Sequence, residues 1–271
     1  MLKAVLLIVV AFFSLFGYVR MTERRTVFLP SIMVDAFPSD AGLEFEDIFF
    51  ETEDKVKLNG WLVKASQHPE RAATLIFFHG NAGNISDRIE RLKILHRIGI
   101  NVFVIDYRGY GKSEGAPSEQ GIYLDAQAAF DHIKARPDIR QDRIIAYGVS
   151  LGGAAAADLA TKRHVNGLIL ESTFTSAPDM AKKILPIAPR FMVKTRMDTL
   201  SKIKRVTVPK LIIHSPFDEL VPYKMALRLY DAAPAPKELL KISGTHNEGY
   251  SDSMETFEGG VRVFLKKYFS D

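Results

Sequence analysis

The sequence predicts an α/β protein with a mostly parallel sheet of about eight strands, flanked by helices on both faces. Short apolar runs recur along the chain, and such runs are typical of strands buried on both faces of a sheet. Stretches with apolar residues at helical spacing separate them. The chain has 271 residues, of which 47% are hydrophobic and 25% charged, which is the composition of a globular protein with room for one such domain.

Residues 1–25 are predicted to be a single-pass membrane anchor. The uncharged residues 4–19 would form a helix about 24 Å long, and the flanking Lys3 and Arg20 can snorkel to extend its reach across a bilayer. A cleaved signal peptide and a buried amino-terminal helix are the alternatives, although no small-residue cleavage site follows the run. Basic residues on both sides leave the orientation open. Residues 26–42, with three Pro or Gly, are predicted to be a stalk before a domain over 43–271.

The domain begins with two strands that are expected to be antiparallel, over 43–50 and 56–63, the second interrupted at Asn59-Gly60. Buried strands and helices then alternate, which predicts parallel pairing. The expected strands lie at 75–78, 102–105, 144–148, 168–170, 211–213 and 239–242. The expected helices lie at 85–95 and 122–133, directly after Ser150, and at 257–268.

One motif has a direct chemical interpretation. Gly148-Val149-Ser150-Leu151-Gly152 joins an apolar run to an alanine-rich helix, as in a nucleophile elbow, where a sharp turn exposes the serine hydroxyl. In parallel sheets, ligands bind beyond the carboxyl ends of the strands. Seven polar residues fall at such ends or in the loops just after them: His79, Asp106, Ser150, Glu171, His214, Asp218 and His246.

A serine nucleophile needs an imidazole as base and a carboxylate to orient it. His246 is the predicted base, because it lies in a loop between the last strand and the terminal helix. The other histidines after Ser150 are expected to be a solvated residue, His164, and a packed one, His214. Asp218 is the predicted carboxylate. Its rival Glu171 is expected to be a structural hydrogen-bonding group, and Glu219 a surface charge.

The oxyanion of the tetrahedral intermediate needs two N–H donors. The predicted donors are the backbone amides of Leu151 and Asn81, and Asn84 is expected to cap the helix that follows. No cofactor and no metal are predicted. Gly109-Tyr110-Gly111-Lys112-Ser113 ends like a phosphate loop, but Asp106 occupies the position of that motif's first glycine.

Charge is spread unevenly along the chain. Residues 174–206 carry eight Lys/Arg and residues 1–25 carry four, whereas the remainder has 24 basic and 29 acidic residues. The pI of about 9.1 therefore does not indicate a nucleic-acid partner, and a membrane surface fits better. Residues 174–206 are predicted to be a small helical cap between the sixth and seventh strands, either a plain lid or one that also docks on an anionic leaflet. The chain has no cysteine, which excludes disulfides and thiol nucleophiles.

Six ordered motifs resemble those of the α/β-hydrolase superfamily, and within it the bud-emergence-type, membrane-anchored serine hydrolases. They are His79 to Asn84, Asp106 to Gly115, Gly148 to Gly153, Glu171 to Ser176, Phe217 to Pro222 and Gly244 to Asn247. The resemblance runs from about residue 44 to the end. It implies an α/β-hydrolase fold with Ser150 as nucleophile, Asp218 as orienting carboxylate and His246 as base.

The predicted activity is cleavage of acyl esters or thioesters through an acyl-enzyme, with membrane lipid as a partner through the amino-terminal helix. Two alternatives stay open at this point. An aminopeptidase on the same fold would need an acidic group for the substrate's free amine, and the basic cap argues against one. The other is a membrane-tethered binding protein without catalysis.

Overall fold

The computed structural model describes residues 2–184, 186 and 189–270. At its centre is an eight-stranded sheet in which the last six strands along the chain pair in parallel, so the predicted fold class is confirmed. The first two strands join it as an antiparallel pair. From edge to edge the order is β10 (Lys237–Lys241), β9 (Lys210–His214), β8 (Gly167–Glu171), β7 (Ile144–Val149), β4 (Thr74–Phe78), β6 (Asn101–Ile105), β3 (Lys57–Val63), β2 (Glu46–Glu51).

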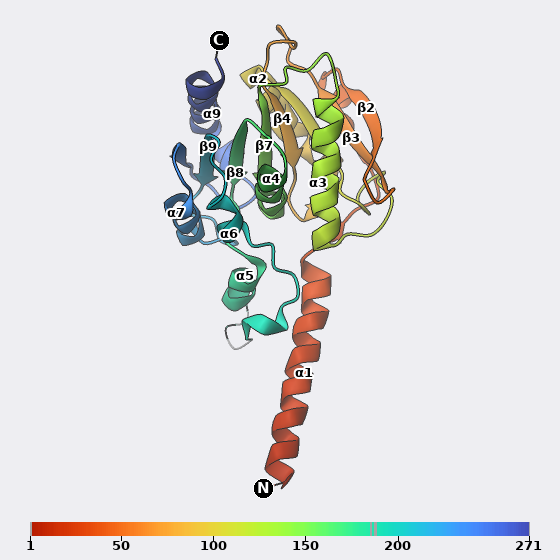
Figure 1. Cartoon of the computed structure of the whole chain (residues 1–271), viewed down its shortest axis with the longest axis vertical. Coiled ribbons are helices and arrows are strands. Elements are labelled where there is room, and N and C mark those ends of the chain that lie inside the picture. The colour runs from red at the N-terminus through yellow and green to blue at the C-terminus, as the bar shows by residue number, and fades with distance from the viewer. Residues whose placement is uncertain (1, 185, 187–188, 271) are drawn as a thin grey trace.

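Helices cover both faces of this sheet (Figure 1). One face carries α3 (Glu119–Lys134), α4 (Leu151–Lys162), α6 (Thr199–Ile203) and α7 (Tyr223–Ala232), and the other carries α2 (Ile89–Ile98) and α9 (Met254–Phe269). In β4, Ile76 and Phe78 face the first layer, and Leu75 and Phe77 face the second. Both faces of β4 are therefore buried, which explains its unbroken apolar run. The short η2 (Ile85–Arg88) precedes α2, and α8 (Gly249–Asp252) precedes α9.

The interruption expected at Asn59-Gly60 is wrong, because β3 is continuous through both residues. A Cβ on Gly60 would lie 2.8 Å from the carbonyl oxygen of Val104, so glycine is required for close packing against β6. The Asn59 side chain donates to Asp47 at 2.6 Å and to the Ile48 carbonyl at 3.1 Å. The sequence alone does not distinguish a glycine that permits close packing of strands from a glycine that interrupts a strand, which explains the wrong expectation.

Helix α1 (Leu2–Thr26) extends away from the body of the molecule (Figure 1). Its segment Val5–Glu23 has a mean hydropathy of 2.1 and is long enough to cross a membrane, a test that amino-terminal signal sequences also pass. Only 6% of this segment is buried. The apolar surface of α1 is thus left open along most of its length.

The segment after α1 differs from the predicted stalk, since it packs on the domain. β1 (Leu29–Pro30) pairs in parallel with β5 (Ala82–Gly83), and the Gly111 amide donates to the Ser31 carbonyl at 2.8 Å. After it, Phe37 lies against Trp61 with ring centroids 5.6 Å apart, just before η1 (Pro38–Ala41). These contacts attach the segment after α1 to the loops that follow β4 and β6, and to β3.

The predicted cap does lie between the sixth and seventh strands of the main sheet, β8 and β9. It contains α5 (Ala177–Ile184) and η3 (Arg190–Met192), while residues 185, 187 and 188 lie outside the described residues. In contrast, α6 packs in the helical layer with α4 and α7 and buries Ile203 fully. Lys202 is accordingly not a surface charge of the cap, because its Nζ pairs with Asp158 at 3.0 Å and lies 3.6 Å from the Tyr123 ring centroid.

Candidate active site

The register of the sheet brings the predicted polar residues to one edge. Phe78 pairs with Gly148, Val149 with Glu171, and Glu171 with Ile213, so these strands end side by side. The loops that follow carry Asn81, Ser150 and Asp218.

Ser150 sits at a strained turn between β7 and α4. Its φ of 54° and ψ of −116° are rarely adopted by residues with a side chain. Two glycines make the turn possible: a Cβ on Gly152 would lie 1.9 Å from the Phe78 carbonyl oxygen, and one on Gly148 would lie 2.3 Å from the Gly152 carbonyl oxygen. The Ser150 amide donates to the Glu171 carbonyl at 2.9 Å, and the Thr173 hydroxyl donates to the Ser150 carbonyl at 2.6 Å. The predicted elbow geometry is therefore present.

The structure brings the three predicted triad side chains together. His246 Nε2 lies 3.0 Å from Ser150 Oγ, and His246 Nδ1 lies 2.7 Å from Asp218 Oδ2. A carboxylate can only accept, so Nδ1 carries the hydrogen and Nε2 presents a lone pair to the serine hydroxyl. The Asp218 side chain is fully buried and that of His246 is 8% exposed.

Asp218 is held in place by its own loop. Its Oδ1 accepts from the amides of Leu220 at 2.9 Å and Val221 at 2.7 Å, leaving Oδ2 for His246. Buried His214 donates from Nε2 to the Val221 carbonyl at 2.8 Å, as its packed position in the sequence predicts. Burial lowers the pKa of His214, so it stays neutral beside Asp218.

Glu171, the rival carboxylate, has other partners. It pairs with Arg91 Nη1 at 2.6 Å and accepts from the Tyr147 hydroxyl. Arg91 in turn lies 3.7 Å from the Tyr250 ring centroid. The structural role expected for Glu171 is thus supported by an ion pair in the interior.

The two predicted oxyanion donors lie beside Ser150. Leu151 is the first residue of α4, where amides have no partner within the helix and the helix dipole favours negative charge. Asn81 follows β4, with its carbonyl accepting from the Leu29 amide at 3.0 Å and from the Tyr110 hydroxyl at 2.8 Å. Both residues line a cavity together with Ser150 and His246. Asn84 caps η2 as predicted, with its side chain accepting from the Ser86 amide at 2.8 Å.

Two cavities meet at Ser150 and His246. One, of about 480 Å³, is mostly apolar and is lined by cap residues such as Phe174, Met180 and Val193. The other, of about 340 Å³, is polar and is lined by Arg88, Arg91 and Glu248, among others. A molecule with one apolar and one more polar part would fit across Ser150, the predicted nucleophile.

Comparisons with known proteins identify the family. A family model described as serine aminopeptidase, S33 (Hydrolase_4), matches residues 69–203. The alpha/beta hydrolase domain-containing protein WAV2 of Arabidopsis thaliana is 39% identical over 254 residues, covering 85% of this chain and 82% of WAV2. Protein bem46 of Schizosaccharomyces pombe is 36% identical over 222 residues, covering 78% of this chain and 74% of bem46. The chain belongs to the α/β-hydrolase superfamily.

Solved structures show the same fold. An esterase of Pyrococcus furiosus matches with a TM-score of 0.73 at 22% identity, over 90% of this chain and 98% of the esterase. Est1E of Butyrivibrio proteoclasticus, solved with ferulic acid bound, matches with a TM-score of 0.69 at 22% identity, over 83% of this chain and 100% of Est1E. The resemblance inferred from the six motifs is confirmed at the level of the superfamily and fold.

Three contacts near the site of this α/β-hydrolase were not predicted from the sequence. The Glu219 carboxylate, expected to be only a surface charge, accepts from the His246 amide at 3.0 Å. The Asn81 side chain donates to the Thr26 carbonyl at 3.0 Å, and Glu23 accepts from the Thr195 amide at 2.5 Å. In the sequence, Glu23 stands out only as the one acidic residue within 20–25, a segment that contains three arginines. Among the described residues, no group of three or more His, Cys, Asp or Glu could hold a metal ion.

Proposed function

We propose that this α/β-hydrolase is a membrane-anchored serine hydrolase that cleaves acyl esters or thioesters. The observation that carries the proposal is the chain of contacts from Asp218 through His246 to Ser150, at 2.7 and 3.0 Å, beside the mouth of an apolar cavity. Helix α1 is the proposed anchor, because its span Val5–Glu23 is apolar and exposed.

In the proposed reaction, Ser150 Oγ attacks the acyl carbonyl carbon as His246 Nε2 takes its proton. Asp218 stabilises the imidazolium, and the amides of Leu151 and Asn81 donate to the oxyanion. His246 then protonates the leaving alcohol or thiol, and an acyl-enzyme forms on Ser150. Water, deprotonated by His246, releases the carboxylic acid and restores the serine.

The test is an activity panel of p-nitrophenyl esters, acyl thioesters and aminoacyl amides, run on the full chain. The expected loss in Ser150→Ala is about a thousandfold or more in kcat. Ser66→Ala, in an exposed loop away from the site, is the matched control and is expected to match the wild type. Labelling of Ser150 by a fluorophosphonate would separate an enzyme from a non-catalytic binding protein, and unlabelled Ser150 would contradict the proposal.

The description of the matching family model favours aminopeptidase activity as a second candidate. A free amine needs a carboxylate, and Glu248 lines the polar cavity beside Ser150. Ser150-dependent hydrolysis of aminoacyl amides in preference to esters in the same panel would favour this second candidate.

A further inference from the structure

The last two turns of α1 form one side of the apolar cavity at Ser150. Five of the lining residues belong to α1 and the residue after it: Val19, Thr22, Glu23, Thr26 and Val27. Their spacing of three and four places them on one face of the helix. The cap supplies the facing side, through Phe174, Met180 and Val193. A membrane helix and a cap thus enclose the space next to the nucleophile.

Hydrogen bonds hold this end of α1 against both the cap and the loop after β4 that carries Asn81. Glu23 accepts from the amides of Lys194 at 3.2 Å and Thr195 at 2.5 Å, and its side chain is 9% exposed. The Thr26 carbonyl, near the end of the helix where carbonyls lack intrahelical partners, accepts from Asn81. Val19 is buried in a cluster with Met192 and Val193 of the cap. The position of α1 beside the cavity is therefore specified by direct contacts.

The same contacts place the cavity at the carboxyl-terminal end of the apolar span Val5–Glu23 of α1. The span ends at Glu23, and the lining residues of α1 lie on both sides of that point. Exposed Phe191 of η3 stacks on Phe12 with ring centroids 6.4 Å apart. Phe12 lies eleven residues before Glu23, which is roughly 16 Å along the helix. The cap therefore runs alongside the part of α1 that a bilayer would surround (Figure 1).

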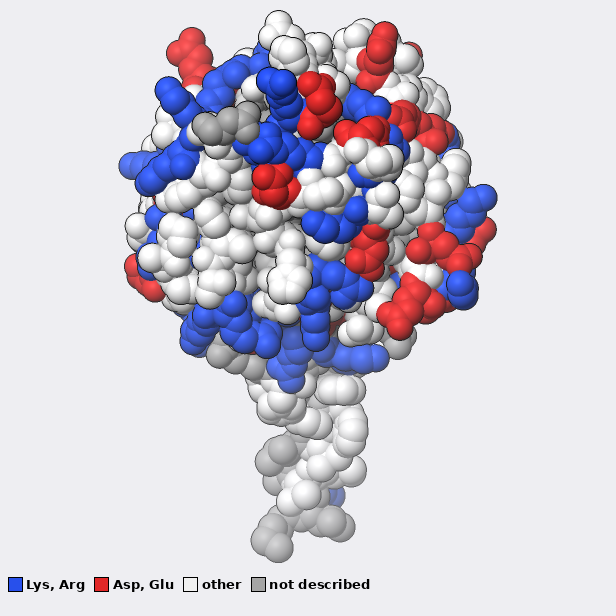
Figure 2. All heavy atoms as spheres, turned by 45° about the horizontal axis from the view of Figure 1, so that its top comes forward, with Lys and Arg blue, Asp and Glu red and all other residues white. Residues whose placement is uncertain are grey.

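The charges around the base of α1 are consistent with a membrane surface near Glu23, where the apolar span ends. Figure 2 shows Lys and Arg side chains gathered on the body just above the point where α1 leaves it. Arg25 in α1 and Lys194 and Arg196 in the cap are exposed near this level. Basic side chains at this height can contact lipid phosphates while the apolar span and Phe191 lie deeper.

We infer that the last two turns of α1 are a wall of the acyl-binding pocket, and that the substrate is a long-chain acyl ester or thioester dissolved in the bilayer. Its acyl chain enters from the membrane along α1 and reaches Ser150 between Thr22 and the cap. This inference rests on the proposed hydrolase function and adds the class of substrate and the route by which it arrives.

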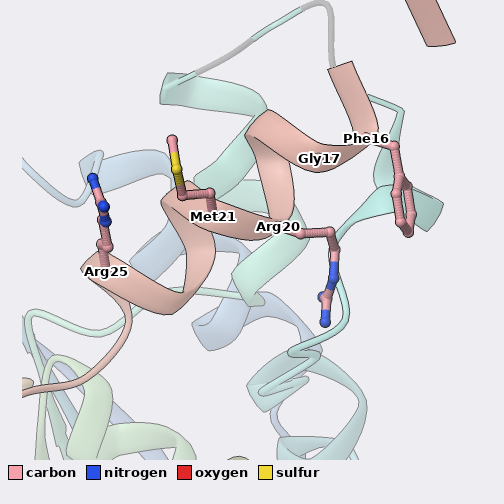
Figure 3. A pocket seen from close by; sticks show the side chains of 5 residues that line it. All are labelled: Phe16, Gly17, Arg20, Met21 and Arg25. Carbon is pink, nitrogen blue, oxygen red and sulfur yellow. The ribbon is translucent and has the colours of Figure 1, made fainter. Parts of the chain in front are cut away.

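A different face of α1 offers a matched control. A separate pocket of about 460 Å³ lies against α1, and its described lining residues, Phe16, Gly17, Arg20, Met21 and Arg25, all belong to this helix (Figure 3). Met21 precedes Thr22 in the chain, is 46% exposed, and does not line the cavity at Ser150. A tryptophan at 21 and a tryptophan at 22 therefore place the same indole group on different faces of α1, one residue apart along the helix.

The experiment uses the full chain in phosphatidylcholine nanodiscs and the 4-methylumbelliferyl esters of acetic, octanoic and palmitic acid. In Thr22→Trp, the ratio of kcat/KM for the octanoyl ester to that for the acetyl ester is expected to fall by about tenfold or more, because the indole occupies the chain's space. In Met21→Trp, the ratio is expected to match the wild type. An unchanged ratio in Thr22→Trp, with Ser150-dependent acetyl hydrolysis intact, would overturn only the inference about α1. Absence of Ser150-dependent hydrolysis of every ester here and of every thioester in the panel above would overturn the proposed function and this inference with it.

A second measurement does not depend on how a variant folds. A hexadecyl fluorophosphonate with a mid-chain diazirine reacts with the wild-type chain, as Ser150 Oγ bonds to phosphorus and fluoride leaves. Irradiation is then expected to crosslink the alkyl chain to residues 19–27 as well as to the cap. Crosslinks to the cap without any to residues 19–27 would contradict the inference.

Discussion

At the level of single residues, the turn at Ser150 depends on close backbone contacts that leave no room for a side chain at Gly148 or Gly152. Ser150 has a positive φ, and the helix after it begins against the end of β4. Gly152 makes the closest of these contacts, with the Phe78 carbonyl. The elbow motif can be recognised in the sequence because these close backbone contacts require glycine at fixed positions around Ser150.

We therefore expect Gly152→Ala to lower the free energy of unfolding by about 1–3 kcal/mol, because its Cβ overlaps the Phe78 carbonyl and must displace α4. Ester hydrolysis should fall with it, since α4 carries the Leu151 amide. Gly259→Ala is the control: this exposed position in α9 has no atom within 4 Å of the added Cβ, so stability should rise by about 0.5–1 kcal/mol. Urea denaturation of both variants checks the pair, and equal effects would refute the packing argument.

At the level of elements, an interior ion pair fastens α2 to the sheet behind the site. Arg91 of α2 meets Glu171 at the end of β8 and the hydroxyl of Tyr147 in β7. The side chains of Arg91 and Glu171 are 7% and 3% exposed. Removing one partner would leave the other charge buried, whereas removing both would not.

Arg91→Met is therefore expected to lower the free energy of unfolding by about 3–5 kcal/mol, because Glu171 loses its compensating charge. The double variant Arg91→Met with Glu171→Leu should recover much of this loss. Thermal and urea unfolding of the single and double variants measure the coupling. If the double variant is as unstable as Arg91→Met, the loss comes from packing and not from the uncompensated carboxylate.

At the level of the whole molecule, we expect stability to depend on pH through a lysine in the core. Lys210 begins β9, is fully buried, and donates from Nζ to the carbonyls of Pro234 at 2.8 Å and Pro236 at 3.2 Å. Burial, followed by the charge of Lys237, lowers the pKa of Lys210 from 10.5 to about 8. Between these two values the unfolded chain binds a proton that the folded chain does not, so the contribution of Lys210 to stability rises with pH.

The wild type should accordingly gain stability relative to Lys210→Met as pH rises from about 8 to 10.5, with a slope of up to about 1.4 kcal/mol per pH unit. The measurement is the difference in free energy of unfolding between the two proteins across pH 7–10.5. A constant difference over this interval would mean that Lys210 titrates normally in the folded state.

On the same scale, the molecule combines an α/β-hydrolase domain with a helix, α1, whose apolar span is only 6% buried among the described residues. Two cavities of different polarity meet at Ser150, and α1 reaches only the apolar one of them. Acyl-chain preference is thus expected to respond to changes in α1, while the leaving-group side depends on the loops after β4 and β10.

The alternation of strands and helices, the elbow, and the order of Ser150, Asp218 and His246 could all be predicted from the chain, because short motifs and periodicity encode them. The catalytic roles of those residues stay predictions that the observed distances support. Three features could not be predicted in this way: residues 26–42 pack on the domain, Glu219 accepts a hydrogen bond from the His246 amide, and α1 borders the cavity. The contacts responsible join residues 55 positions apart in Thr26 and Asn81, and 172 apart in Glu23 and Thr195. Contacts over such separations arise when the sheet and the cap assemble, and no local pattern carries them.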